Sequence, residues 1–370
     1  MAPALDCFAV AAPGLEPLVA EELAALGLAG SVVEGGVEVT LPRAALPEVN
    51  RRLGIASRLL VRLGGFHART FPELERHAAR LDWGSVVAPH QAVAFRVTSR
   101  KSRLYHQGGI AERLGRVVAD AVGGAQAVRW PPDDAPDDGA VQRIIVRVFR
   151  DEFTVSADSS GALLSRRGYR LASGKAPVRE TLAAAMLRAA GYDGTTPLVD
   201  PFCGSGTIAI EGAFVALGRA PGALRAMACD AWPGLSPPAP AADVRGAPSS
   251  IAASDRDAGA IAATRQNAER AGVADAISLR EAALSAVRLP ATPGHLVTNP
   301  PHGIRIGEHR RLRDLYAALG NLLRAGGQGW SVHLLTPHED LARATGLPLH
   351  ERFRTPSGGM WVQCWGGVLA

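Results

Sequence analysis

The stretch Thr196-Pro197-Leu198-Val199-Asp200-Pro201-Phe202-Cys203-Gly204-Ser205-Gly206-Thr207-Ile208-Ala209-Ile210-Glu211-Gly212-Ala213 decides the fold of this 370-residue chain. A short apolar run ends in an acid, a turn with two glycines follows, and a longer apolar run comes after the turn. This order predicts a buried strand, a tight loop and the start of a helix. Strand, loop and helix in that order form the ligand-binding edge of a doubly wound α/β sheet, so we expect this fold class.

The glycine turn is compatible with two kinds of ligand. Gly204-x-Gly206-x-x-Ala209 satisfies the dinucleotide fingerprint, which would indicate hydride transfer. A dinucleotide, however, would bring its pyrophosphate charge close to the Asp200 carboxylate. S-adenosylmethionine carries an ammonium and a sulfonium instead of phosphate, so Asp200 favours this methyl donor. Gly204 and Gly206 then let the backbone approach the methionine part of the donor without Cβ clashes.

A second strand ending in acid is predicted at residues 251–257. Asp255 is expected to accept hydrogen bonds from the two ribose hydroxyls, as an acidic residue does in dinucleotide folds. Asp257 is expected to be the N-cap of a helix at residues 258–271, because Asp is a preferred N-cap residue. Asp255 is therefore our first choice for the ribose.

Two further features belong to this half of the chain. Residues 277–284 predict a third strand, from which Glu281 can reach the adenine amino group. The interval between Asp200 and Asp255 is longer than the roughly 20 residues of the compact fingerprint. The segment Gly218–Ser250, rich in Pro, Gly and Ala, accounts for the excess and predicts an insertion or a lid-like excursion.

Residues 295–303, His-Leu-Val-Thr-Asn-Pro-Pro-His-Gly, predict a fourth strand that ends in a reactive turn. A nucleobase amine is a poor nucleophile because its lone pair is delocalised into the ring. The Asn299 side-chain oxygen and the Pro300 carbonyl can accept both N–H hydrogens and orient the lone pair, while Pro301 stiffens the turn. His302 adds a stacking surface, worth roughly 1–3 kcal/mol per base. Asn-Pro-Pro alone is common loop punctuation, but together with the glycine turn it indicates an amino-methyltransferase.

These residues give the chain a resemblance to the THUMP-bearing guanine-N2 RNA methyltransferases, most closely to the branch that modifies large-subunit ribosomal RNA. The resemblance is carried by stretches spread over nearly the whole chain: Phe8–Glu16, Asp158–Gly161, Arg167–Arg170, Ala176–Pro177, Glu180–Ala185, Asp200–Thr207 and Asn299–Gly303. It implies a Rossmann-like class I methyltransferase domain, S-adenosylmethionine as donor, and an N-terminal module that grips RNA. It also implies donor-binding roles for Asp200, Phe202, Gly204, Ser205, Gly206, Thr207, Asp255 and Glu281.

The chain departs from the family pattern at two positions. The family usually carries Tyr after Asn-Pro-Pro, where this sequence has His302; imidazole is planar but smaller, and it can be protonated. Glu281 stands where an Asp is usual. Neither change removes the acceptors of Asn299 and Pro300, so the resemblance still implies an active enzyme.

Length and local patterns predict the domain organisation. A chain of 370 residues should hold two or three domains of about 100–200 residues each. We expect a ferredoxin-like portion at 1–45, a THUMP-like RNA-binding domain at 46–160, and a methyltransferase domain with a seven-stranded, mostly parallel sheet at 161–370. In the α+β region before residue 160, a helix is predicted at 15–26 and β structure at 4–11, 32–41, 55–63, 93–98 and 143–149.

Basic residues indicate where RNA binds. The net charge is +5, and residues 90–116 concentrate six basic side chains against Glu112 alone, with Tyr105 and His106 interleaved. Such a patch predicts phosphate binding that weakens steeply with salt. All but two of the 40 basic residues are arginine, so a merely Arg-rich surface is the alternative interpretation. A second basic stretch, 166–179, lies at the hinge. The expected RNA contacts are Arg58, Arg62, Arg96, Arg100, Lys101, Arg103, Arg167 and Arg170.

Other functions have little support in the sequence. There is no run of about 20 apolar residues and no charged-then-apolar leader, so we expect a cytoplasmic protein without a membrane span, assumed to be a monomer. The four cysteines lack C-x-x-C spacing, and the histidines lack metal-ligand spacing, so no metal site is expected. Cys203 lies inside the glycine turn, where a packing role is favoured over a nucleophilic one.

The expected activity is therefore methylation of a guanine N2 amine, in 23S rRNA in preference to tRNA. The alternatives are a tRNA guanine-N2 methyltransferase, an adenine-N6 or cytosine-N4 DNA methyltransferase, and a non-catalytic RNA-binding factor. The Asn-Pro-Pro turn recognises an amine and not a particular ring, which keeps the DNA enzyme open. Because His302 and Glu281 depart from the family pattern, a non-catalytic RNA-binding factor remains an alternative.

Overall fold

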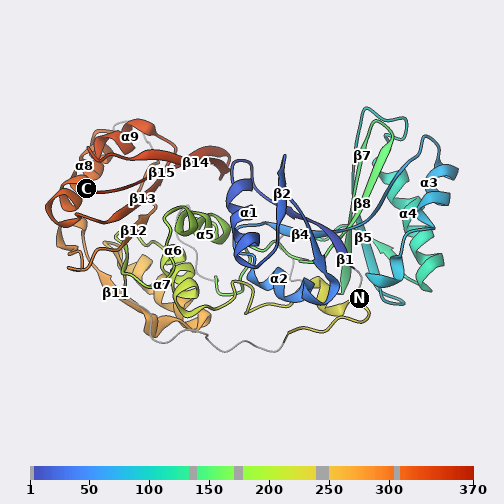
Figure 1. Cartoon of the computed structure of the whole chain (residues 1–370), viewed down its shortest axis with the longest axis horizontal. Helices are drawn as coiled ribbons and strands as arrows, with labels where there is room; N and C mark the ends of the chain where they lie inside the picture. The colour runs from blue at the N-terminus through green and yellow to red at the C-terminus, as the bar shows by residue number, and fades with distance from the viewer. Residues whose placement is uncertain (1–3, 133–139, 171–177, 239–249, 304–308) are drawn as a thin grey trace.

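The computed structural model describes residues 4–132, 140–170, 178–238, 250–303 and 309–370. The chain is elongated, with an N-terminal and a C-terminal sheet arranged along its long axis (Figure 1). Ala176–Pro177, one of the stretches that carry the family resemblance, and half of the basic stretch 166–179 lie outside the described residues.

The N-terminal part is an eight-stranded sheet among residues 4–132 and 140–158, in the order β2-β3-β1-β4-β8-β7-β5-β6. The strands are β1 Ala4–Val10, β2 Gly30–Val33, β3 Gly36–Pro42, β4 Arg58–His67, β5 Ala92–Arg100, β6 Gln126–Val128, β7 Val141–Phe149 and β8 Glu152–Asp158. The helices are α1 Glu16–Ala25, α2 Leu46–Arg52, α3 Phe71–Ala78 and α4 Gln107–Val122.

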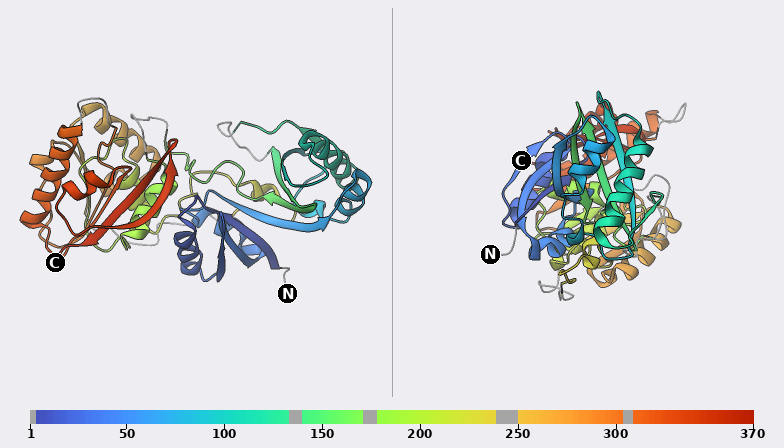
Figure 2. Two further views of the ribbon diagram at one scale, coloured as in Figure 1. Left: turned by 90° about the horizontal axis from the view of Figure 1, so that it is seen from above. Right: turned by 90° about the vertical axis from the view of Figure 1, so that its right-hand side faces the viewer.

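Strand β4 joins the two halves of this sheet, because it pairs with β1 on one side and with β8 on the other. The sheet is therefore continuous across the division expected at residues 45/46. The long curved β4 can be followed through both halves in the left view of Figure 2. Helix α4 and strand β8 were not predicted from the sequence; α4 buries Ile110, Leu114 and Val118, which share one face at a spacing of four residues.

The C-terminal part is a seven-stranded sheet among the described residues from 178 onward, in the order β11-β10-β9-β12-β13-β15-β14. The strands are β9 Leu198–Asp200, β10 Ile251–Asp255, β11 Ile277–Glu281, β12 His295–Thr298, β13 Ser331–Thr336, β14 His350–Ser357 and β15 Met360–Val368. The helices are α5 Glu180–Ala189, α6 Thr207–Leu217, α7 Ala258–Ala271, α8 His309–Gly326 and α9 Glu339–Ala344. The first five strands of this sheet run parallel, and β15 runs antiparallel to β13 and β14.

This sheet is doubly wound, as predicted. One apolar cluster includes residues of α5, α6 and α7, and a second one on the other face includes residues of α8 and α9. Strand β9 lies between β10 and β12, so the chain runs outward to β11 and then returns past β9 to β12. Such a reversal of strand order places a ligand site at the carboxyl ends of the adjoining strands.

The segment Gly218–Ser250 does not cover the ligand-binding edge in its described part, residues 218–238. It reaches back to the N-terminal sheet: Trp232 Nε1 donates to Gln142 Oε1 at 2.7 Å, and Arg51 forms an ion pair with Asp230 at 2.6 Å. Of the two alternatives expected from composition, an insertion or a lid-like excursion, residues 218–238 fit an insertion that forms an interdomain strap and do not fit a lid. The strap is anchored because Met227, Cys229 and Trp232 are buried.

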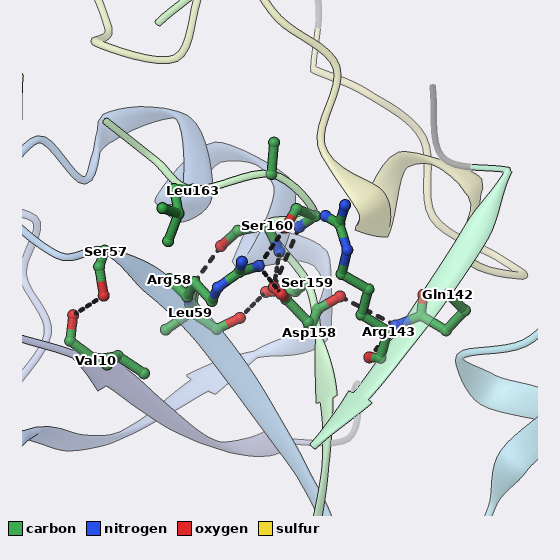
Figure 3. Close-up of polar contacts among 12 residues, drawn as sticks. Val10, Ser57, Arg58, Leu59, Gln142, Arg143, Asp158, Ser159, Ser160 and Leu163 are labelled. Atoms are coloured by element: carbon green, nitrogen blue, oxygen red, sulfur yellow. Dashed lines mark hydrogen bonds and ion pairs between the residues drawn. The ribbon is translucent and has the colours of Figure 1, made fainter. Parts of the chain in front are cut away.

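A buried polar network lies where the strap, β4 and the residues after β8 meet (Figure 3). The Arg58 guanidinium pairs with the Asp158 carboxylate and donates to the Gly161 carbonyl. Ser160 Oγ donates to Asn50 Oδ1 at 2.6 Å. Arg225 of the strap donates to the Ser160 carbonyl at 2.6 Å. The resemblance stretch Asp158–Gly161 thus joins the two parts of the chain.

This network corrects the prediction that Arg58 contacts RNA. The residue is only 6% exposed, because β4 lies in the middle of the sheet with both neighbours paired. Its charge is needed inside the protein, where burial raises the pKa of Asp158 and Arg58 lowers it again. Arg58 is therefore a structural residue.

Replacing Arg58 by methionine is expected to destabilise the fold by about 3–5 kcal/mol, because the Asp158 carboxylate stays buried without its cation. Urea unfolding of wild type and variant measures this difference. Arg100→Met is the matched control, since Arg100 lies exposed on β5 and its replacement should change stability by less than about 0.5 kcal/mol. Equal midpoints for the two variants would contradict the role assigned to Arg58.

Candidate active site

A cavity of about 1290 Å³ opens at the carboxyl edge of the C-terminal sheet. Residues at or just after the ends of four of the parallel strands, β9 to β12, line it, with contributions from α6, α7, α8 and β15. The Asp200 turn and the Asn299 turn, which are far apart in sequence, face this one cavity. The lining includes Asp200, Phe202, Gly204, Ser205, Thr207, Asp255, Asn299, Pro300, Pro301 and His302.

The glycine turn needs both of its glycines. Gly204 has φ +55° and Gly206 has φ +84°, in the left-handed region that side chains disfavour. A Cβ on Gly206 would lie 2.5 Å from Thr264 Cγ2, whereas a Cβ on Gly204 would meet nothing within 4 Å. Gly206 therefore allows close packing against α7, and Gly204 leaves open space beside the backbone.

Two residues that the sequence analysis missed hold this turn in place. Thr264 Oγ1 donates to the Gly204 carbonyl at 2.8 Å, and Asn267 Nδ2 donates to the Ser205 carbonyl at 3.0 Å. Both side chains are fully buried on α7. Their three-residue spacing on the buried face of a helix was the available signal, since buried polar side chains there need partners.

Asp200 is a buried carboxyl group without a cationic partner among the described residues. Its Oδ1 accepts from Thr298 Oγ1 at 2.6 Å and from the Phe202 N–H at 3.2 Å. Burial raises the pKa of Asp200 to about 7; the two hydrogen bonds oppose this shift and nearby Asp255 adds to it. A ligand cation next to Asp200 would therefore favour its ionised form.

The two acids after β10 have separate roles. Asp257 accepts from the Gly259 N–H at 2.7 Å and the Ala260 N–H at 3.4 Å, so it is the N-cap of α7. Asp255 lines the cavity, and its Oδ2 accepts from the Gly204 N–H at 3.1 Å. Asp255 thus connects the end of β10 to the glycine turn while keeping acceptor capacity toward the cavity.

Glu281 ends β11, as expected, but its side chain is not among the residues that line the cavity. The side chain is exposed, and the cavity wall after β11 is formed by Ala282, Ala283, Leu284 and Ser285. Strand β11 is the edge strand of the sheet, so its terminal carboxylate can turn to solvent. The expectation of an adenine contact from the Glu281 side chain is corrected to a mostly apolar wall.

The Asn299 turn presents an unused acceptor. Asn299 Oδ1 is buried and has no hydrogen-bond partner among the described residues. Buried polar atoms are nearly always paired, so an unpaired one at a cavity indicates a place for a ligand donor. Thr298, the residue before Asn299, is fully buried and donates a hydrogen bond to Asp200, so it connects the Asn299 turn to the glycine turn.

His302 is locked against its own turn. Its Nδ1 lies 3.0 Å from the Pro300 carbonyl oxygen, which can only accept, so Nδ1 carries the hydrogen. Burial lowers the pKa of His302; the Pro300 contact opposes this shift and His338 adds to it. The ring is therefore neutral near pH 7, with Nε2 as an acceptor, and its plane is held by the backbone.

The expected RNA contacts divide into two groups. Arg96, Arg100, Lys101 and Arg103 are exposed on β5 and the loop after it. Arg62 is partly buried and lies over the Phe8 ring, with 5.0 Å between its Cζ and the ring centroid.

The structure corrects the prediction that Arg167 contacts RNA, and it places Arg170 partly buried beside the cavity-lining Thr207. Arg167 is 1% exposed and pairs with Glu211 of α6 at 3.3 Å. Arg170 pairs with Glu180 at 2.7 Å and donates to Thr207 Oγ1 at 2.6 Å. Their guanidinium groups are used to attach the hinge to α5 and α6, because burial requires a partner for each charge.

Cys203 is buried, and burial raises the pKa of its thiol. A thiol that resists ionisation is a packing group and not a nucleophile. Among the described residues, no helix is long and apolar enough to cross a membrane.

The sheet order, the glycine turn and the ligand edge together define a class I methyltransferase domain preceded by an α+β region. The chain belongs to the RMKL-like methyltransferase domain family (UPF0020), whose family model matches residues 167–358. A second model, the RlmL ferredoxin-like domain, matches residues 6–60.

Named relatives and a solved structure agree with this membership. The "Putative RNA methyltransferase slr0064" of Synechocystis is 30% identical, with 95% of this chain and 94% of that protein covered. The ribosomal RNA large subunit methyltransferase K/L of Syntrophotalea carbinolica is 34% identical over 95% of this chain, which spans 52% of that longer protein. SMU.472, "a putative methyltransferase complexed with SAH", superposes with a TM-score of 0.83 at 27% identity, covering 100% of this chain and 99% of that one.

Proposed function

We propose that this chain transfers a methyl group from S-adenosylmethionine to the exocyclic N2 amine of a guanine in RNA, with 23S rRNA favoured over tRNA. The relative from Synechocystis is named as an RNA methyltransferase and the one from Syntrophotalea as acting on large-subunit ribosomal RNA, which supports RNA as the substrate class. The single observation that carries the amine assignment is the unpaired, buried Asn299 Oδ1 at the cavity.

The residues in and around the glycine turn have the chemistry needed to bind S-adenosylmethionine. Asp200 offers a carboxylate without a cationic partner among the described residues, and Gly204 leaves open space beside the backbone. Asp255 retains acceptor capacity for ribose hydroxyls, and the apolar wall formed by Ala282–Leu284 suits an adenine ring. S-adenosylmethionine, when bound, supplies an electrophilic methyl group on its sulfonium. The SAH complex of SMU.472 supports this choice of donor.

The Asn299 turn prepares the nucleophile. Asn299 Oδ1 and the Pro300 carbonyl accept the two hydrogens of the target amine, which draws its lone pair out of the ring. The neutral His302 ring, held by Pro300, stacks on the base. The amine nitrogen would form a bond to the methyl carbon as the bond from that carbon to the donor sulfur breaks, with S-adenosylhomocysteine as the leaving group. The resulting ammonium then releases one proton to water, so no strong base is needed. A paired guanine must first leave its stack.

A methylation assay tests this proposal. The protein is incubated with methyl-labelled S-adenosylmethionine and unmodified 23S rRNA, tRNA or duplex DNA, and the digested nucleosides are identified by mass spectrometry. We expect N2-methylguanosine, formed on 23S rRNA. A methylated adenine or cytosine amine in DNA would replace the proposed substrate. Absence of donor binding in calorimetry would leave only the non-catalytic RNA-binding role.

A further inference from the structure

The β14–β15 hairpin lies between the N-terminal part and the cavity. Gly14, in the turn before α1, has φ +85°, and a Cβ there would lie 2.0 Å from the Arg354 carbonyl oxygen of β14. Met360, directly after the turn of the hairpin, begins β15 and lines the cavity. Figure 1 shows β14 extending toward α1. One hairpin therefore contacts both the module expected to hold RNA and the cavity expected to receive the target base.

Two large apolar side chains at the start of β15 are exposed to solvent. Met360 is 48% and Trp361 is 50% exposed, although large apolar side chains gain most when they are covered. The Arg354 guanidinium lies over the Trp361 indole, with 5.3 Å between Cζ and the ring centroid. Among the described residues, no carboxylate forms an ion pair with Arg354.

The Trp361 ring beside the Arg354 guanidinium matches the chemistry of a nucleotide, which has an aromatic base and an anionic phosphate. Nucleobases stack on indole rings whatever their sequence, and the phosphate next to the base is attracted by the guanidinium. Arg311 of α8 lines the cavity together with Met360, the residue before Trp361, and adds positive charge there. A single-stranded stretch of RNA matches this combination, because its unstacked bases and its phosphates are both available.

We propose that Trp361 and Arg354 bind a nucleotide that flanks the target, Trp361 by stacking on its base and Arg354 by pairing with its phosphate. This inference rests on the proposed function, since it assumes that RNA enters the cavity. It adds a contact that lies outside the Asn299 turn and outside the basic loop after β5. The pair would hold the strand in register while the target base occupies the cavity.

Equilibrium binding of an unmodified 23S rRNA transcript to the full-length protein tests the pair. Trp361→Ala is expected to weaken RNA binding about tenfold or more, in line with the loss of one base stack, while Trp361→Phe keeps most of the affinity. Arg354→Ala should weaken binding and reduce the slope of log affinity against log salt by about one phosphate contact. Arg352→Ala is the matched control, because it removes the same charge from β14 without an aromatic partner. Affinity for S-adenosylmethionine should stay unchanged in all four variants.

The fluorescence of Trp361 tests this RNA contact independently of the proposed methylation activity. The fluorescence of Trp361, taken as the difference between wild type and Trp361→Phe, should be quenched by the transcript. If wild type methylates RNA but neither quenching nor loss of affinity is seen, the inference is wrong and the function stands. If RNA quenches Trp361 without any methylation, the RNA contact stands and the proposed activity is wrong. If RNA does not bind at all, both are overturned.

Discussion

Asn299→Ala is expected to lower the rate of methyl transfer by about a hundred- to a thousandfold while leaving donor affinity unchanged. The estimate corresponds to removal of one preorganised polar contact to a reacting group. Asn299 Oδ1 is buried and unpaired, so the substrate amine would be its partner. Single-turnover assays on saturating RNA measure the rate, and calorimetry with S-adenosylmethionine measures donor binding.

Asn299→Asp is the matched control for this prediction, because a carboxylate keeps an acceptor oxygen at the same position. It should retain more activity than Asn299→Ala. Thr298 and Asp200 connect the two turns, so a general collapse of the site would also reduce donor binding. Full activity of Asn299→Ala would remove the basis of the amine assignment.

Asp200→Asn is expected to weaken donor binding about 10- to 100-fold at pH 8, because a hydrogen bond to a charged group contributes about 1.5–3 kcal/mol. Burial raises the pKa of Asp200 to about 7, so wild-type Asp200 is ionised at pH 8 and mostly protonated at pH 5.5. The ratio of variant to wild-type dissociation constants should therefore shrink as the pH falls through 7. Taking this ratio cancels the titration of the donor's own amino group.

The same carboxyl group should make the ligand-free protein less stable at high pH. The unfolded chain ionises Asp200 near its ordinary pKa of about 3.9, whereas the folded chain keeps the proton until the pKa of about 7 is reached. The folded state binds more protons in this window, so its stability falls as the pH rises from about 4 to 7 and then levels off. Thermal unfolding of Asp200→Asn at pH 8 should thus show a higher Tm than wild type. A lower Tm for the variant would contradict the raised pKa.

The elements around the site followed closely from local patterns. Helix α7 has the predicted bounds 258–271, and Asp257 is its N-cap as expected. The carboxyl ends of β9, β10 and β12 meet at one edge because parallel strands joined by crossover helices must place them there. These features depend on residues that are close in sequence, where periodicity and capping act directly.

The wrong predictions have a common physical cause. Arg58 and Arg167 were assigned to RNA by their charge, but each is buried by a partner that arrives from far along the chain; Asp158 is 100 residues away from Arg58. The segment Gly218–Ser250 was expected from its composition to be an insertion or a lid-like excursion, and in its described part Trp232 bonds to Gln142, 90 residues earlier, so this part is not a lid. Amino-acid composition indicates which side chains need a partner, but it does not identify the partner, because the partner can come from a distant part of the chain.

The sequence alone determined the doubly wound methyltransferase fold, the glycine turn and the Asn-Pro-Pro turn, because the signals for strands, turns and helices are local. It also determined where the ligand binds, because a parallel sheet has its ligand-binding edge at the carboxyl ends of the strands. Only the tertiary structure decided which charges face solvent, that Asn299 Oδ1 is left without a partner among the described residues, and that Trp361 lies exposed beside the Arg354 guanidinium. Those properties are set by long-range packing, since burial and pairing of a polar group depend on neighbours from distant parts of the chain.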